Sequence, residues 1–393
     1  MREAGAKRLD EVRFSPIRAM IDRVKELKDQ GLDVVSLVAG EPDFPTPQPI
    51  KEATISALNA DFTHYGSNRG YPPLRKAVAE SLLQETGVNY DPEWEIIVTC
   101  GGAEAINNTL LTLINPGDEV ILFTPAFVSY ENLIRLCGGT VVQVPMRPEN
   151  GFQIDLSETE KHITDRTRLM VLNNPSNPTG AVLQKDILDG LSRLACKHDL
   201  LVVADEIYSR LTYDGAAFCS MASFPGMKER TVIINGFSKT YAMTGWRLGY
   251  MAAARPVAQQ LLKMHQYSTT CAPTFLQIGL ANALKLQETD QAVRDMVKTF
   301  ALRREALAKG LADAKGIRFV PPLGAFYFFL DVSGTGLDGE TFSKRLIDEK
   351  LVGTVPGASM GENCENFVRL SFAASLENIE KGARRITEFA NAL

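Results

Sequence analysis

Residues 231–250 read TVIINGFSKTYAMTGWRLGY and predict two strands, 232–235 and 248–252, joined by a segment that carries Lys239. Similar short runs rich in β-branched residues precede them, at residues 95–99, 119–123, 140–144, 169–172 and 201–204. Helical patterns lie between these strands, for example over residues 103–114 and 186–198. Because strands that alternate with helices are typical of βαβ units, we predict an α/β fold with a mostly parallel sheet flanked by helices.

The pattern changes near residue 285. A long, charged helical stretch over residues 291–314 is followed by the run FVPPLGAFYFFLDV, a further helix, the strand FVRLSFA and a terminal helix. The first 40 residues are too few for a core of their own, so a helix over residues 17–30 is expected to pack on this C-terminal part. We therefore predict a large domain over residues 41–285 and a smaller α+β domain made of residues 1–40 and 286–393.

Composition narrows the classes of protein. The 393 residues include 42 Lys and Arg against 47 Asp and Glu, a net charge of −5 without the basic excess of a nucleic-acid binder. No apolar run approaches the roughly 20 residues of a membrane span, and no signal-peptide pattern is seen. The six cysteines are scattered without a CxxC pair, which predicts buried thiols in a reducing compartment. We expect a cytoplasmic protein that uses no metal, nucleic acid or membrane.

Polar side chains follow three of the predicted strands. Lys239 comes after strand 232–235, Asp205 ends the run LLVVAD and is followed closely by Tyr208, and Asn177 lies in NNPSNPTG after strand 169–172. Each has an ordinary alternative: a solvated lysine, a helix cap, a rigid turn. Together they converge on the sheet edge where open α/β folds bind ligands. A lysine desolvated there can form a Schiff base with an aldehyde.

A second pattern, TCGGAEA at residues 99–105, places two glycines between a strand and a helix. The free N–H groups of Gly102, Ala103 and Glu104 could face an anion, although two glycines can equally form a tight turn.

Five strings in this order resemble the class I and II aminotransferases of pyridoxal-phosphate fold type I: NNPSNPTG, ADEIY, GFSKTYAMTGWRLGY, GAFYFF and FVRLSFA. The resemblance runs from Val38 to the C-terminus, and it implies a homodimer whose large domain binds pyridoxal 5′-phosphate.

The resemblance also implies residue roles. Lys239 would form the Schiff base and move the substrate proton, Asp205 would pair with the pyridine nitrogen, and Tyr208 with Asn177 would bind the phenolic oxygen. Ser238, Arg247 and the 102–104 amides would bind the phosphate, and Tyr65 would reach the phosphate of the partner subunit's cofactor. Phe127 would stack on the ring or serve as core packing. Arg369, Asn177 and the backbone at Gly40 would bind the substrate carboxylate.

The implied activity is transfer of an amino group from an L-amino acid to a 2-oxo acid, with 2-oxoglutarate as the expected acceptor. The strings PAFVSY and HQYSTTCAPTF are closer to the branch that takes aromatic or varied amino acids, so aromatic, neutral and acidic donors are expected. Two alternatives stay open: a carbon–sulfur β-lyase on the same scaffold, and a regulatory domain that binds the cofactor without turnover.

Overall fold

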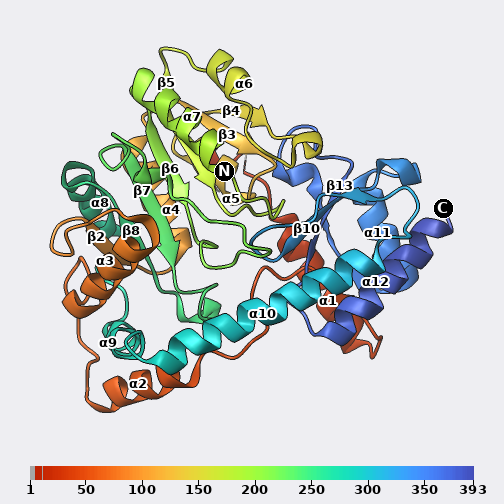
Figure 1. Ribbon diagram of the computed structural model, residues 1–393, viewed down its shortest axis with the longest axis horizontal. Helices are drawn as coiled ribbons and strands as arrows, with labels where there is room; N and C mark the ends of the chain where they lie inside the picture. The colour runs from red at the N-terminus through yellow and green to blue at the C-terminus, as the bar shows by residue number, and fades with distance from the viewer. Residues whose placement is uncertain (1–4, 11) are drawn as a thin grey trace.

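The computed structural model of the chain describes residues 5–10 and 12–393 (Figure 1). Its largest sheet has seven strands in the order β2-β8-β7-β6-β5-β3-β4. Strand β8 runs antiparallel to both of its neighbours, and the remaining pairs are parallel. The strands are β2 (Ile96–Thr99), β3 (Glu119–Thr124), β4 (Thr140–Pro145), β5 (Thr167–Asn173), β6 (Leu201–Asp205), β7 (Thr231–Gly236) and β8 (Gly249–Ala252). The mostly parallel α/β sheet predicted from the sequence is confirmed.

Helices cover both faces of this sheet, which explains why its strands read as continuous apolar runs. One face packs on α4 (Gly102–Leu113), α5 (Ser129–Leu136) and α8 (Arg255–Ser268). The other packs on α7 (Lys185–Lys197) and on α3 (Pro72–Thr86) with α9 (Thr274–Ala283). Neighbouring residues of β6 illustrate the alternation, because Val203 belongs to the first core and Val202 to the second.

The C-terminal part forms a four-stranded antiparallel sheet in the order β12-β13-β10-β9. Its strands are β9 (Arg318–Phe319), β10 (Tyr327–Asp331), β12 (Val355–Pro356) and β13 (Phe367–Ser371). Three helices belong to this part: α10 (Gln287–Gly310), α11 (Gly339–Lys350) and α12 (Leu376–Asn391). The division into two domains at residues 40 and 285 stays a prediction, and residues 1–4 and 11 of the smaller one lie outside the described residues.

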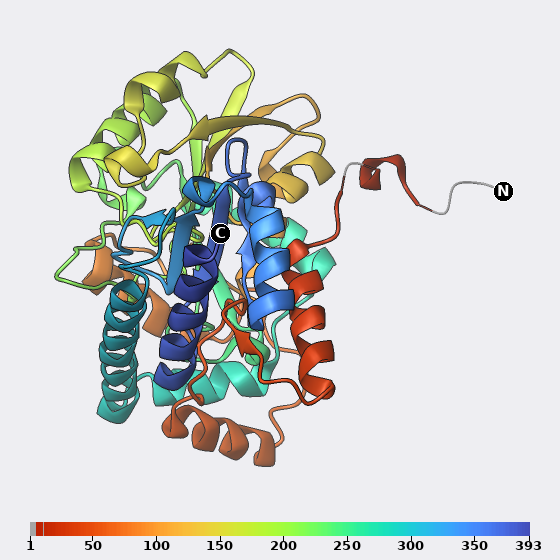
Figure 2. The same ribbon diagram turned by 90° about the vertical axis from the view of Figure 1, so that its right-hand side faces the viewer.

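The first long helix, α1 (Pro16–Asp29), packs on this C-terminal part as expected and stands beside α11, with α12 on the other side of α11 (Figure 2). Val24 shares a buried cluster with Ile347 and Val355, and Arg23 forms an ion pair with Asp348 at 3.1 Å. Strand β1 (Val35–Ser36) then pairs in parallel with β11 (Val352–Gly353). The next helix, α2 (Gln48–Asn59), packs on α9 of the large sheet's layers.

The cysteines depart from expectation. All six are free thiols, but only Cys364 is buried; Cys196 is exposed and the other four are partly exposed. Cys137 caps the end of α5 and Cys196 lies in the last turn of α7, so these two lie at helix ends near the surface. Within the described residues, no helix is long and apolar enough to cross a membrane.

Candidate active site

The polar residues meet where the parallel strands end. Asn173, the last residue of β5, pairs with Asp205, the last residue of β6, and Asp205 pairs with Ile234 of β7. Lys239 follows three residues after β7 ends at Gly236. The register therefore places the segments that carry Asn177, Asp205 and Lys239 side by side at one edge of the sheet.

Lys239 has an amine of unusual acidity. Burial lowers its pKa to about 8 from the ordinary 10.5, and the charges of Glu41, Arg247, Asp205 and Arg369 are all close enough to act on it. Its Nζ donates a hydrogen bond of 2.6 Å to the carbonyl oxygen of Gly40. A partly deprotonated amine near neutral pH can serve as a nucleophile or as a base.

Asp205 is a buried carboxylate with two donors. Tyr130 donates its hydroxyl to Oδ2 at 2.6 Å, and the Ile207 amide donates to Oδ1 at 3.1 Å. Burial raises the pKa of Asp205, and these two hydrogen bonds with the nearby Lys239 charge oppose the rise. The site thus holds an acid that a cation beside it would keep ionised.

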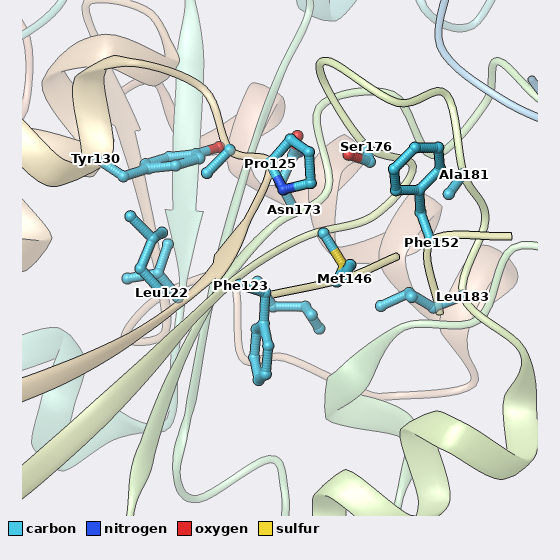
Figure 3. Close-up of a pocket in the computed structure, with 13 residues that line it drawn as sticks. Leu122, Phe123, Pro125, Tyr130, Met146, Phe152, Asn173, Ser176, Ala181 and Leu183 are labelled. Atoms are coloured by element: carbon cyan, nitrogen blue, oxygen red, sulfur yellow. The ribbon is translucent and has the colours of Figure 1, made fainter. Parts of the chain in front are cut away.

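A small cavity lies between the ends of β3 and β5, with Tyr130 on its lining (Figure 3). Its volume is about 10 Å³, and Tyr130, Pro125, Met146, Phe152 and Leu183 are among its mostly apolar lining. This space could hold a single water and no substrate, so the Tyr130 ring is closely surrounded on this side.

Arg369 points from β13 toward the strand ends although it is 1% exposed. Its Nη1 donates to Asn177 Oδ1 at 3.1 Å, its Nη2 donates to the Val38 carbonyl at 2.8 Å, and its guanidinium lies 4.7 Å from the centre of the Tyr327 ring. Its Nε is buried and has no hydrogen-bond partner among the described residues. A guanidinium so placed is ready for a carboxylate.

Tyr208, four residues after the start of ADEIY, is 4% exposed. Its hydroxyl forms a hydrogen bond of 3.0 Å with the hydroxyl of Tyr327, which links the end of β6 to β10. The same Tyr327 hydroxyl would lie 2.8 Å from a Cβ at Gly40, so the absence of a side chain at Gly40 allows this close approach.

The predicted anion site has the expected backbone. Helix α4 begins at Gly102, so the amides of Gly102, Ala103 and Glu104 stand in its first turn. Gly101 has φ +81°, and a Cβ there would lie 2.7 Å from Nη2 of Arg247, which therefore lies against this turn. Ser238 is buried one residue before Lys239.

The Glu104 carboxylate does not face the anion position freely. Its Oε2 accepts from the Cys100 amide at 2.5 Å, and its Oε1 accepts from His265 Nδ1 at 2.7 Å and from Asn108 at 2.9 Å. Only the backbone amide of Glu104 is suited to an anion, because its side chain carries negative charge and caps the helix start.

A cleft of about 1620 Å³ opens at Lys239. Gly40, Ala103 and Phe127 line it with Lys239, and the Phe127 ring packs edge to face on Tyr130 at 5.8 Å between centroids. Tyr65 lies elsewhere, 88% exposed on the surface of this chain. Among residues 5–10 and 12–393, no group of three or more His, Cys, Asp or Glu side chains could hold a metal ion.

Two site residues were missed by sequence reasoning. Tyr130 lies in the quoted string PAFVSY, three residues after Phe127 and in the first turn of α5, and its closeness in sequence to Phe127 is a weak signal for a shared site. Tyr327 lies in GAFYFF among other aromatic residues, and nothing local separates it from the core.

Comparisons with known proteins agree over nearly the whole chain. The family model for aminotransferase class I and II matches residues 32–386. The chain is 42% identical to an aspartate aminotransferase of Pyrococcus abyssi over 98% of this chain and 97% of that protein. It is 41% identical to aromatic-amino-acid aminotransferase 2 of Thermococcus litoralis, again over 98% and 97%.

Solved structures show the same likeness. The aspartate aminotransferase of Thermus thermophilus with maleate superposes with a TM-score of 0.94, 40% identity and full coverage of both chains. An aromatic aminotransferase of Pyrococcus horikoshii gives a TM-score of 0.90 at 41% identity, covering 94% of this chain and 99% of that one.

Proposed function

The chain belongs to the family of class I and II aminotransferases, and we propose that its cleft binds pyridoxal 5′-phosphate and transfers an amino group from an aromatic, neutral or acidic L-amino acid to 2-oxoglutarate. The observation that carries the proposal is the position of the Lys239 amine just after β7, next to β6 that ends at Asp205, with its Nζ 2.6 Å from the Gly40 carbonyl and its pKa lowered by burial to about 8.

The residues present fit this cofactor. Three amides in the first turn of α4, the Ser238 hydroxyl and the Arg247 guanidinium suit a phosphate, and Gly101 lacks the Cβ that would press on Arg247. The Asp205 carboxylate suits a protonated ring nitrogen, whose positive charge would offset the burial that raises the Asp205 pKa. Lys239 would hold the cofactor through its amine. When bound, the cofactor supplies an aldehyde carbon and a ring that accepts electrons.

Lys239 then has a second task. Once its Nζ is free, it can take the proton from the substrate α-carbon, since a pKa of about 8 leaves part of the amine unprotonated near neutral pH. The Gly40 carbonyl lies 2.6 Å from this nitrogen and would orient it. Tyr208 would donate its hydroxyl to the phenolic oxygen with Asn177, and Tyr327 holds Tyr208 in place.

Arg369 would bind the carboxylate that every amino acid and oxo acid shares. Its hydrogen bonds to Asn177 and to the Val38 carbonyl fix the guanidinium before substrate arrives, and its Nε has no partner among the described residues. Selection of the side chain would then rest on the cleft wall, which includes Phe127 and Val128 as well as Ile17 and Ile21 of α1. These apolar side chains support aromatic and neutral donors, and Arg13 and Arg18, which also line the cleft, suit an acidic one.

We propose further that the protein acts as a homodimer in the cytoplasm. Tyr65 and Tyr267 are 88% and 87% exposed, and Phe62 is 46% exposed. Thr274 donates to the His64 carbonyl at 2.9 Å and Asn68 donates to the Thr270 carbonyl at 2.8 Å, so the segments that carry Tyr65 and Tyr267 lie side by side. A group of exposed apolar side chains of this kind is typical of surfaces that bind another protein. Tyr65 would then serve the phosphate site of the partner chain.

The proposal is tested by adding single amino acids to the protein reconstituted with pyridoxal 5′-phosphate. Loss of the visible cofactor absorbance, recovered on adding 2-oxoglutarate, is the expected result, and Lys239→Ala is the inactive control. Release of pyruvate and a thiol from a cysteine conjugate would indicate the lyase instead. Binding of the cofactor with no response to any amino acid would indicate the regulatory domain.

A further inference from the structure

The side chain of Glu104 belongs to the turn proposed to bind phosphate but points away from the cleft. Its backbone amide stands in the first turn of α4, with the amides of Gly102 and Ala103. Ala103 lines the cleft, whereas the Glu104 carboxylate is directed to the last turn of α8 and its side chain is only 11% exposed. One residue thus offers an amide to the anion position and carries a negative charge close to it.

This carboxylate has a use of its own at the helix start. Its Oε2 accepts from the Cys100 amide at 2.5 Å, just before the turn formed by Gly101 and Gly102. A negative charge in the first turn stabilises a helix, because the helix dipole is positive there. The same charge opposes a phosphate bound at that turn, since like charges repel strongly in a partly buried site. Phosphate affinity should therefore depend on where the Glu104 carboxylate lies.

His265 is the closest side-chain partner of this carboxylate. Its Nδ1 donates to Glu104 Oε1 at 2.7 Å, and its ring is fully buried in the last turn of α8. Because an ionised carboxylate only accepts, the hydrogen of this bond lies on Nδ1. Asn108 and Ser268 donate to the same oxygen at 2.9 and 3.2 Å, but Asn108 also donates to Ser268.

The charge on Glu104 is present at neutral pH. Burial acts to raise the pKa of Glu104, but the hydrogen bonds from His265 and from the Cys100 amide outweigh burial and lower this pKa below its ordinary value. The carboxylate therefore stays ionised beside the anion position, and its charge has to be held in place rather than removed by protonation.

The backbone of the turn does not depend on His265. The Gly101 amide donates to the Thr99 carbonyl at 2.8 Å, and the Ala105 amide donates to the Gly101 carbonyl at 3.3 Å. These bonds form the turn without help from α8. What His265 can decide is the position of the Glu104 charge.

The second ring nitrogen of His265 shows that packing alone does not account for this residue. Nε2 is buried and has no hydrogen-bond partner among the described residues. A buried polar atom without a partner destabilises the fold, and an apolar side chain of similar size would avoid that cost. The benefit of an imidazole at this position must therefore come from Nδ1 and its bond to Glu104.

We infer that His265 is a positioning residue for the phosphate site, because it holds the Glu104 carboxylate on the Cys100 amide and away from the anion that the first turn of α4 would bind. The inference rests on the proposed function, since it assumes that this turn binds the cofactor phosphate. His265 does not touch the cofactor and acts only through Glu104.

A purely structural role for His265 makes a different prediction. If His265 only packs α8 on α4, its loss lowers the melting temperature and changes the affinity for every form of the cofactor alike. If it controls the Glu104 charge, its loss weakens ligands that carry a phosphate and leaves phosphate-free ligands unchanged. The effect then disappears once Glu104 is uncharged.

The test measures binding of pyridoxamine 5′-phosphate and of pyridoxamine to the cofactor-free, full-length protein by calorimetry. Neither ligand has an aldehyde, so neither can form a Schiff base with Lys239. The ratio of the two affinities therefore reports the contribution of the phosphate, without any measurement of turnover. Melting temperatures are recorded for each variant.

The variants separate the two nitrogens of the ring. His265→Asn can place an amide nitrogen where Nδ1 lies, whereas His265→Gln reaches the position of Nε2, and His265→Leu has no donor. His198→Leu is a matched control, because His198 Nε2 lies 3.2 Å from Glu160 Oε1 at the end of α7, near the start of β6 and not at the strand ends that form the site.

We expect His265→Leu and His265→Gln to lower the affinity ratio about five- to tenfold, with pyridoxamine bound as in wild type, because a hydrogen bond to a charged group is lost. His265→Asn should stay within about twofold of wild type, and His198→Leu should leave the ratio unchanged. In a Glu104→Gln background, His265→Leu should change the ratio by less than about twofold. If His265→Leu folds poorly, His265→Gln carries the same comparison in both backgrounds.

Equal losses in the Asn, Gln and Leu variants, or a loss of both ligands together, would overturn the inference in favour of packing. A full loss in the Glu104→Gln background would also overturn it, because no charge is then left to hold. If wild type itself bound the two ligands equally, the turn would not be a phosphate site. The proposed function would then fail at this point and the inference with it, whatever the variants showed.

Discussion

Replacing Tyr130 with Phe removes only the hydroxyl that donates to Asp205 Oδ2 at 2.6 Å. The ring is 1% exposed and its contact with Phe127 remains. A hydrogen bond to a charged group contributes about 1.5–3 kcal/mol, whereas one between neutral groups contributes about 0.5–1.5 kcal/mol. The loss should therefore be larger when Asp205 is ionised than when it is protonated.

The sign of the pH dependence follows from the pKa of Asp205. Burial raises this pKa in the folded protein, so the folded state binds the proton more tightly than the unfolded state does. The stability that Asp205 gives the cofactor-free protein thus falls as pH rises through the unfolded and then the folded pKa. Without the Tyr130 hydroxyl the folded pKa rises further, so the gap between wild type and Tyr130→Phe should widen with rising pH.

The assay is thermal unfolding of the cofactor-free protein across pH, together with turnover at saturating substrate. Tyr213→Phe is a matched control, since Tyr213 is 3% exposed and donates at 2.5 Å to the neutral Ala325 carbonyl. If Asp205 must be ionised for turnover, a loss of about 1.5–3 kcal/mol corresponds to a rate about ten- to hundredfold lower. Equal, pH-independent losses in both variants with normal turnover would refute the reasoning.

Lys239→Met should abolish turnover yet raise the melting temperature of the cofactor-free protein below pH 8, because it removes a buried charge. Burial lowers the Lys239 pKa to about 8, so the gain in melting temperature should shrink as pH rises from there toward the ordinary pKa of 10.5. Melting curves at pH 7 and above 10 check it, and a gain that is the same at both would contradict it. Arg369→Lys should weaken every amino acid and oxo acid together by about ten- to hundredfold with little change in selectivity, as KM measurements across several substrates will show. Refolding Lys239→Met with Tyr65→Ala should restore up to about half of the sites in mixed dimers, and no recovery in dimers shown to be mixed would place Tyr65 outside the shared site.

The sequence predicted those site residues that lie at or just after the ends of the apolar strands. Asp205 and Lys239 come immediately or shortly after apolar strands, and the carboxyl ends of parallel strands meet at one edge. The strand runs were equally readable, since a sheet covered on both faces leaves continuous apolar segments, as in β6 and β7.

Contacts between distant segments could not be read in this way. The hydroxyl of Tyr130 reaches Asp205 across 75 positions, Tyr208 meets Tyr327 across 119, and Arg303 meets Asp43 across 260. Nothing local marks these partners, because each side chain has an ordinary use as core packing or a surface ion pair. Their pairing is a product of how the two sheets and α10 pack together.

The site is built from two sheets with different tasks. Asp205 and Lys239 follow strands of the seven-stranded sheet, whereas Arg369 and Tyr327 belong to the four-stranded sheet. The groups proposed to act on the cofactor and those proposed to bind the carboxylate therefore meet only through direct contacts, such as Arg369 with Asn177 and Lys239 with the Gly40 carbonyl. A small shift of one sheet against the other would change substrate affinity while leaving the bond between Tyr130 and Asp205 intact, since both of those residues lie on the large sheet's side. Because Arg369 lies on the four-stranded sheet, Arg369→Lys should affect KM more than kcat.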